Sequence, residues 1–248
     1  MRLQSRTAIV TGGSRGIGAA IVEAFAREGA DVAFCHDGDE EGAGAVAARA
    51  AASGRRIRPA RCDVGSATEV NAFFADAERD FGRVDILVNN AGIGGETPFE
   101  NISLAAFERM IAVNLRAQFL FAQLAAPGMR RRRWGRIINI ASQLAYRGAP
   151  GLVHYCAAKA GVVGMTRALA VELAPEGVLV NAIAPGLVDT RLNSGLSAAW
   201  TARKLAEMPI GRMGRPQDIA PTAVLLASSE GDFYVGQTLS PNGGDVFL

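Results

Sequence analysis

The sequence is poor in residue types on which whole classes of proteins depend. Its three cysteines, Cys35, Cys62 and Cys156, are too few and too scattered for a disulfide framework or a zinc site. No apolar run approaches the roughly 18 residues of a membrane span, and the N-terminus carries no cleavable apolar segment. We therefore expect a cytoplasmic protein without a metal site, a disulfide or a membrane anchor.

An excess of charge of one sign is also lacking. The 26 basic and 24 acidic residues give a net charge of +2, which argues against nucleic acid or an anionic membrane as a partner. Four consecutive arginines at 130–133 are best explained as a solvated helix end, where positive charge offsets the helix dipole.

Lysine is the rarest charged residue. Only two of the 26 basic residues are lysines, and one of them, Lys159, follows Tyr155 by four residues in a chain with three tyrosines. On a helix this spacing places both side chains on one face. An ammonium beside a phenol stabilises the phenolate and lowers the phenol pKa, so Tyr155 becomes a candidate general acid and base.

The pattern along the chain alternates strand and helix. Strands are expected at 7–12, 31–36, 57–64, 84–92, 135–142, 178–186 and 236–244. Helices are expected at 16–30, 39–53, 66–81, about 103–131, 154–175 and 216–228, and the segment 188–215 reads as irregular. Several strands are continuous apolar runs, which indicates burial on both faces. We predict an α/β fold in a single domain, 1–248: a doubly wound parallel sheet of about seven strands flanked by helices.

A glycine-rich loop, TGGSRGIG at 11–18, separates the first strand from the first helix. Gly12 permits a tight turn, Gly16 lets a pyrophosphate approach the backbone, and Gly18 allows the helix to pack closely on the sheet. The helix N-terminus then favours the phosphate charge. This loop favours a dinucleotide over a nucleoside triphosphate, because the GK[ST] of a P-loop is missing.

These motifs occur in a fixed order with NNAG at 89–92, Asn114, Ser142, YCAAK at 155–159 and PG at 185–186. Together they resemble the short-chain dehydrogenase/reductase family over nearly the whole chain, and MPIGRMGRPQDIA and GQTLSPNGG are also similar to it. The resemblance implies a Rossmann fold and an oxidoreductase that interconverts a carbonyl and a secondary alcohol. The implied catalytic residues are Asn114, Ser142, Tyr155 and Lys159.

The resemblance also implies a role for each of these residues. Tyr155 would exchange a proton with the substrate oxygen, Ser142 would hydrogen-bond that oxygen, and Asn114 would join Lys159 in a water-mediated proton relay. The positive charge of an oxidised nicotinamide would help Lys159 to lower the Tyr155 pKa. Lys159 would also hydrogen-bond the cofactor ribose. The segment 188–215 would shape the substrate pocket.

The cofactor contacts follow from the same resemblance. Asp63 would bond the adenine amino group, residues 89–92 would line the ribose and pyrophosphate, and 185–188 would hold the carboxamide. The expected cofactor-binding residues are Gly12, Ser14, Arg15, Gly16, Ile17, Gly18, His36, Asp37, Asp63, Val64, Asn90, Ala91, Gly92, Tyr155, Lys159, Pro185, Gly186 and Val188.

The choice between NADP(H) and NAD(H) depends on a few positions. Arg15, before the second glycine of the loop, favours NADP(H). His36 stands where NAD-preferring relatives usually carry an acid, and Asp37 would repel a 2′-phosphate. We favour NADP(H) narrowly, with NAD(H) as the close alternative.

The substrate is less defined. The local similarity is strongest to 3-oxoacyl-[acyl-carrier-protein] reductases, which makes an acyl carrier protein a possible partner and the 130–133 run a possible docking site. However, Glu176 stands where those reductases commonly place a basic residue. A reductase or dehydrogenase of a sugar, polyol or cyclic alcohol stays open, as does a non-catalytic nucleotide-binding regulatory protein, although the intact catalytic set argues against the latter. The family also implies a homotetramer built through 103–131, 154–175 and the C-terminal segment.

Overall fold

A seven-stranded parallel sheet forms the centre of the protein, for which a computed structural model describes residues 1–247. The strand order is β3-β2-β1-β4-β5-β6-β7, and every neighbouring pair is parallel. The strands are β1 (Thr7–Val10), β2 (Asp31–His36), β3 (Ile57–Arg61), β4 (Ile86–Asn89), β5 (Gly135–Ile140), β6 (Val178–Ile183) and β7 (Thr238–Leu239). This order confirms the predicted doubly wound α/β fold.

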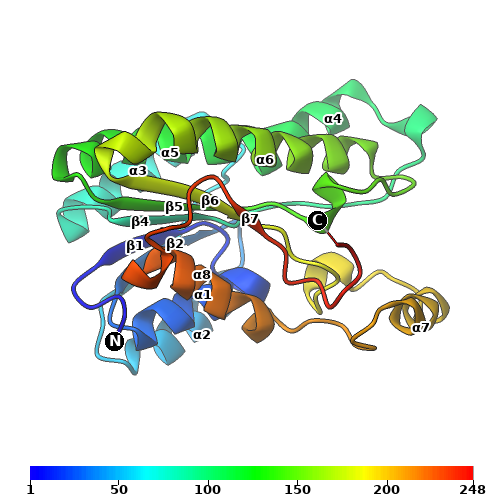
Figure 1. Ribbon diagram of the computed structural model, residues 1–248, viewed down its shortest axis with the longest axis horizontal. Coiled ribbons are helices and arrows are strands. Elements are labelled where there is room, and N and C mark those ends of the chain that lie inside the picture. The colour runs from blue at the N-terminus through cyan, green and yellow to red at the C-terminus, as the bar shows by residue number, and fades with distance from the viewer. Residues whose placement is uncertain (248) are drawn as a thin grey trace.

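Helices cover both faces of the sheet, and Figure 1 shows the layers. The helices are α1 (Gly16–Arg27), α2 (Glu40–Ala51), α3 (Ala67–Phe81), α4 (Leu104–Ile111), α5 (Ala117–Arg132), α6 (Val153–Leu173), α7 (Ala198–Glu207) and α8 (Pro216–Ala227). Helices α1, α2 and α8 lie below the sheet in that view, and α3, α5 and α6 lie above it. Within residues 1–247 no helix combines the length and hydropathy needed to span a membrane.

Each face of the sheet has its own apolar core. On the α1 and α8 side Phe25 and Phe34 are fully buried, and on the α3 and α5 side Phe121 is fully buried. Phe73 meets Phe121 edge to face at a centroid distance of 6.1 Å. Strands β1, β2, β4 and β5 are buried along their whole length, which explains their continuous apolar sequences.

Three elements differ from the prediction. Residues 198–207 of the supposedly irregular segment form α7, whose N-cap Ser197 accepts a hydrogen bond from the backbone of Trp200 at 3.2 Å. The final strand is only two residues long, and Gly243 and Gly244 beyond it take positive φ. The expected helix over 103–131 is continuous but changes to a π turn at 112–116.

Candidate active site

A crevice for an elongated ligand is expected where the order of the sheet reverses, between β1 and β4. The connections leave these two strands toward opposite faces, so their carboxyl ends are not covered by the same loop. The glycine turn lies here. Gly12 and Gly16 adopt φ of +66° and +57°, and a side chain on Gly18 would overlap the carbonyl oxygen of Gly12. The three glycines are therefore required by the backbone, as the spacing predicted.

The turn is fixed by its hydrogen bonds to the end of β4. The hydroxyl of Thr11 accepts from the backbone N–H groups of Asn90 and Ala91, both at 2.9 Å. The Asn90 amide in turn donates to the carbonyl oxygens of Thr11 at 2.9 Å and Gly12 at 3.0 Å. The NNAG motif thus braces the glycine turn through Asn90 and Ala91.

The N-terminus of α1 is left open to an anion. Arg15 at the N-cap is extended and its side chain does not cap the helix, and the first turn carries no acidic residue. The unpaired N–H groups and the helix dipole then favour a phosphate at this point. Together with the glycine turn, this arrangement fits the pyrophosphate of a dinucleotide, with Ser14, Gly16 and Ile17 around it.

The four predicted catalytic residues come from three elements. Ser142 follows β5, Tyr155 and Lys159 lie on the buried face of α6, and Asn114 lies in the π turn between α4 and α5. All four are buried, with Tyr155 9% and Lys159 3% exposed. The Lys159 ammonium donates to the carbonyl oxygen of Ile140 at 2.9 Å and lies 5.6 Å from the centroid of the Tyr155 ring.

The pKa values of this pair differ from the expectation. Burial raises the pKa of Tyr155 to about 12, and the nearby Ser142 hydroxyl offsets only part of this rise. Burial also lowers the pKa of Lys159 to about 8. In the protein chain alone, burial is therefore the main influence on the pKa of the phenol, and the Lys159 ammonium is directed at the carbonyl oxygen of Ile140. The expected lowering needs a further positive charge beside the phenol.

The π turn at Asn114 explains why asparagine stands inside a long helix. Its amide donates to the carbonyl oxygens of Ile93 and Met110, both at 3.1 Å. Its Oδ1 atom is buried without a protein partner, and a Cβ on Gly92 would lie 2.8 Å from it. Buried oxygens without a partner are rare and mark places for water or a ligand. The geometry suits the water relay that the resemblance implies.

Gln118 is a neighbour of this relay that the sequence did not indicate. It lies one turn after Asn114 and donates to the backbone oxygens of Asn114 at 3.1 Å and Ile140 at 3.3 Å. Ile140 therefore accepts from both Gln118 and Lys159. The i to i+4 spacing from Asn114 was the available signal.

The adenosine end of the crevice carries charges of both signs. Arg15 lies 3.3 Å from Asp39, a residue that the sequence reasoning missed, and the Ser14 hydroxyl is the first of the groups that lower the Asp39 pKa. His36 is buried at the end of β2, 3.5 Å from Glu40, while Asp37 is exposed.

Asp63 is engaged in an ion pair that the sequence did not indicate. Its carboxylate accepts two hydrogen bonds from Arg109, at 2.9 and 3.0 Å, and this side chain is the main cause of its lowered pKa. Val64 beside it is buried. The carboxylate expected at the adenine is thus held in place from α4.

The segment after β6 closes the far end. Val188 is buried and pairs with Gly214, and the Gly186 N–H donates to the oxygen of Pro241 at 3.2 Å, so the 185–188 turn is fixed from two sides. Thr190, which the sequence reasoning also missed, reaches across to the glycine turn: its Cγ2 would lie 3.3 Å from a Cβ on Gly16. The glycine turn and the 185–190 segment therefore face each other.

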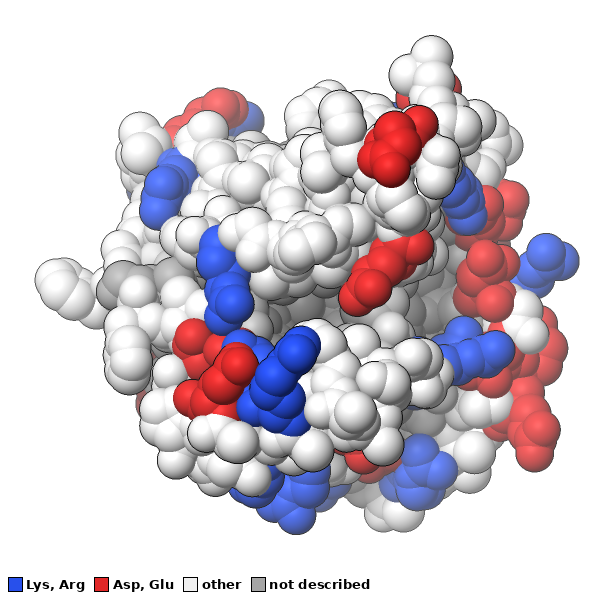
Figure 2. Space-filling view, turned by 90° about the vertical axis from the view of Figure 1, so that its right-hand side faces the viewer, with Lys and Arg blue, Asp and Glu red and all other residues white. Residues whose placement is uncertain are grey.

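Figure 2 views the end of the molecule that carries α4, α7 and the C-terminal segment. The surface is hollowed near the middle of this face, and charged side chains of both signs border the hollow. Leu192 from the 188–215 segment lies against Gly94, where a Cβ would lie 2.9 Å from its side chain.

The chain is similar to several known proteins over nearly its whole length. A family model described as Enoyl-(Acyl carrier protein) reductase matches residues 12–245. The chain is 39% identical over 240 residues to 3-oxoacyl-[acyl-carrier-protein] reductase FabG of Staphylococcus aureus, covering 97% of this chain and 98% of the relative. It is 41% identical over 244 residues to acetoacetyl-CoA reductase of Rhizobium meliloti, covering 98% and 99%.

A solved structure is similar over its whole length. A blue fluorescent protein from a metagenomic library, in complex with NADPH, superposes with a TM-score of 0.94 at 37% identity and 100% coverage of both chains. The fold and the site define an oxidoreductase of the Rossmann type. The chain belongs to the short-chain dehydrogenase/reductase family.

Proposed function

We propose that this protein is an NADP(H)-dependent 3-oxoacyl thioester reductase. The observation that carries the proposal is the placement of Ser142, Tyr155 and Lys159 beside a dinucleotide crevice, in a chain about 40% identical to reductases of 3-oxoacyl-[acyl-carrier-protein] and acetoacetyl-CoA. Among carbonyl substrates, these relatives favour a thioester over a sugar, polyol or cyclic ketone.

The proposed mechanism assigns the proton to the protein. When bound, the nicotinamide supplies or accepts the hydride. Ser142 and Tyr155 orient the substrate oxygen, and Tyr155 donates its proton to that oxygen during reduction or withdraws it during oxidation. A phenol whose pKa is about 12 is protonated at neutral pH, so in the chain alone Tyr155 is present in the acid form that reduction requires and not in the base form that oxidation requires.

Reprotonation of Tyr155 would proceed through Lys159 and Asn114. The Lys159 pKa of about 8 lets this ammonium exchange a proton near neutral pH, whereas a solvated lysine would hold it. The unpartnered Oδ1 of Asn114 supports a water at the end of this path. Lys159 would additionally hold the ribose.

NADP(H) is supported by Arg15 at the glycine turn and by the NADPH complex of the solved relative. Asp37 and Asp39 oppose a 2′-phosphate, and Asp39 already engages Arg15 at 3.3 Å. We therefore expect NADP(H) to be preferred by a modest factor, with NAD(H) also accepted.

The identity of the group that carries the thioester, a carrier protein or coenzyme A, is less well supported than the reaction. Arg130 of the 130–133 run is paired with Glu176 at 2.8 Å and Glu172 at 3.4 Å, and Arg133 donates to the oxygen of Pro175 at 3.2 Å. These contacts occupy arginines that would otherwise be available to pair with the acidic residues of a carrier protein. Coenzyme A thioesters are therefore proposed as substrates alongside those of a carrier protein.

A homotetramer is proposed from the family and from exposed apolar side chains. Leu104 on α4, Phe119 on α5 and Val171 on α6 are 72%, 45% and 79% exposed. Burial of this surface in a second copy would be favourable. Light scattering should give about four times the 25.9 kDa chain mass, and a monomeric mass would contradict the assembly. The cytoplasmic location stays a prediction.

The deciding assay follows cofactor oxidation by the loss of the near-ultraviolet absorbance of the reduced nicotinamide. It is run with 3-oxoacyl thioesters, enoyl thioesters, aldoses and cyclic ketones, each with NADPH and NADH. Tyr155→Phe should lower kcat by about 10²–10⁴ while cofactor affinity is retained. Tyr146→Phe is the matched control. Full turnover in Tyr155→Phe would refute the assigned role, and an absence of turnover with every carbonyl would favour the regulatory alternative.

A further inference from the structure

Helix α7 lies at one end of the molecule and has little packing of its own. None of its residues is buried. Figure 1 shows it at the edge of the molecule, away from the sheet. Its C-terminal end is attached to the C-terminal segment, since Met208 is buried and the N–H of Ile210 donates to the oxygen of Gly243 at 3.2 Å. The residues of α7 itself must therefore be held by contacts other than apolar packing.

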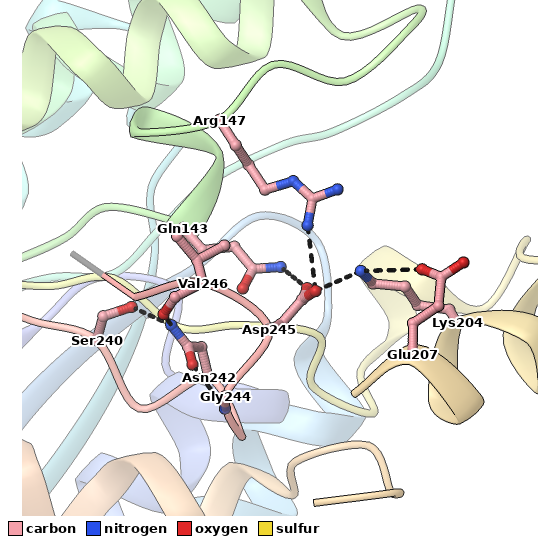
Figure 3. A network of polar contacts seen from close by, with 9 residues as sticks. All are labelled: Gln143, Arg147, Lys204, Glu207, Ser240, Asn242, Gly244, Asp245 and Val246. Carbon is pink, nitrogen blue, oxygen red and sulfur yellow. Dashed lines mark hydrogen bonds and ion pairs between the residues drawn. The ribbon is translucent and has the colours of Figure 1, made fainter. Parts of the chain in front are cut away.

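One buried carboxylate connects α7 to the catalytic side of the site, as Figure 3 shows. Asp245, whose side chain is 4% exposed, accepts from the Gln143 amide at 2.6 Å and from Arg147 at 3.1 Å, and it also pairs with the Lys204 ammonium of α7. Three segments distant in the sequence thus meet at one charge.

The segment that carries Asp245 is itself ordered by hydrogen bonds. The Asn242 amide donates to the hydroxyl of Ser240 at 3.0 Å and to the oxygen of Val246 at 2.6 Å, and its own oxygen accepts from the Gly244 N–H at 2.9 Å. This arrangement, visible in Figure 3, fixes the direction of the carboxylate before any ligand arrives.

The other side of the contact adjoins the catalytic serine. Gln143 directly follows Ser142, and its backbone N–H donates to the oxygen of Pro185 at 3.0 Å. Its side chain therefore links Asp245 to the segment that holds the Ser142 hydroxyl. Burial alone would raise the pKa of Asp245, but hydrogen bonds from Lys204 and Gln143 prevail and keep that pKa below its usual value. The carboxylate is thus charged at neutral pH.

We propose that Asp245 is a positioning residue of the substrate site, which holds α7 and the turn after Ser142 in one geometry and so sets substrate affinity. Removal of its charge leaves Lys204 and Arg147 without their buried partner, a costly state that α7 escapes by moving away. The proton chemistry of Tyr155 needs none of these atoms. The effect on substrate affinity rests on the proposed function, whereas the ordering of α7 does not.

Asp245→Asn and Lys204→Gln test the two ends of this ion pair, and Glu207→Gln is the matched control. Glu207 lies on the same helix, 3.8 Å from the same ammonium, and is 60% exposed. Hydrogen exchange of the amides of α7, measured without substrate, should accelerate about tenfold in both test variants and stay at the wild-type rate in the control. The double variant should exchange no faster than either single variant.

Steady-state kinetics supply the second readout. KM for a 3-oxoacyl thioester should rise at least about fivefold in both test variants, with kcat within about twofold and cofactor affinity unchanged, and Lys204→Arg should restore most of the loss. Unchanged exchange of α7 in Lys204→Gln would overturn the proposal, even if Asp245→Asn failed to fold. A fall in kcat at constant KM would also overturn it. If no thioester is turned over, the proposed function fails while the exchange experiment still decides the role of Asp245.

Discussion

Replacement of Lys159 by methionine should stabilise the protein while it removes activity. Lys159 is 3% exposed, and its pKa is lowered from 10.5 to about 8 by burial. At about 1.4 kcal/mol for each pH unit, keeping this ammonium charged inside the protein costs about 3 kcal/mol at pH 7. Methionine fills a similar volume without that cost. It loses the hydrogen bond to Ile140, whose oxygen keeps a donor in Gln118 at 3.3 Å.

The net stabilisation at pH 7 should be about 1–2 kcal/mol once the lost hydrogen bond, about 1.5 kcal/mol, is subtracted. For a chain of this length it corresponds to a rise in Tm of about 3–6 °C. The pH dependence has a defined sign. Between about pH 8 and 10.5 the folded protein has lost the Lys159 proton that the unfolded chain still holds, so wild-type stability rises relative to the variant as pH increases. The advantage of Lys159→Met should therefore shrink across this window.

Scanning calorimetry of the cofactor-free protein at several pH values measures both effects. Lys159→Arg is the control, because it retains a buried charge that cannot be discharged, and it should not be stabilised. If Lys159→Met melts at or below the wild-type temperature at pH 7, or if its advantage does not change up to pH 10, desolvation of the ammonium is not the dominant cost and the reasoning fails.

Two further predictions concern the cofactor crevice. Gly18→Ala places a methyl group against the carbonyl oxygen of Gly12, so cofactor affinity should fall at least about tenfold in a fluorescence titration, and unchanged affinity would contradict the required close packing. Asp39→Asn removes the carboxylate 3.3 Å from Arg15, so the ratio of NADPH to NADH affinity, measured by direct titration, should rise about five- to tenfold. Glu41→Gln, in the first turn of the same helix, is its control. If Glu41→Gln changed this affinity ratio equally, the effect would come from the net charge of the protein and not from the contact between Asp39 and Arg15.

The parts of the site that depend on local sequence could be predicted. The glycine turn was identified because Gly12, Gly16 and Gly18 each meet a backbone constraint within eight residues, and the buried strands because an apolar run has one explanation inside a doubly wound sheet. The i to i+4 spacing likewise placed Tyr155 and Lys159 on one face of α6. In each case the sequence pattern and the structural feature that it predicts lie within the same helix, strand or turn.

The features that were missed depend on contacts between distant segments. Asp39 meets Arg15 across the first βαβ unit, and Asp245 meets Gln143 from 102 residues away. Charge and spacing alone gave no reason to join them. Helix α7 was missed for another reason: its ten residues lie inside a segment rich in polar residues, glycine and methionine, which is typical of irregular structure, and none of them is buried. The raised pKa of Tyr155 in the chain alone could not be predicted, because the sequence supplies the neighbouring charge but not the degree of desolvation.

The catalytic side of the crevice also combines several locally unfavourable features. Lys159 carries a charge that burial disfavours, the Oδ1 atom of Asn114 has no protein partner, and the helix around it departs from α geometry. A bound ribose and a relay water would supply partners for the Lys159 ammonium and the Asn114 Oδ1 atom. A core that is continuous on both faces of the sheet tolerates this cost. Substitutions in this region that stabilise the cofactor-free protein, such as Lys159→Met, are therefore expected to abolish its catalytic activity.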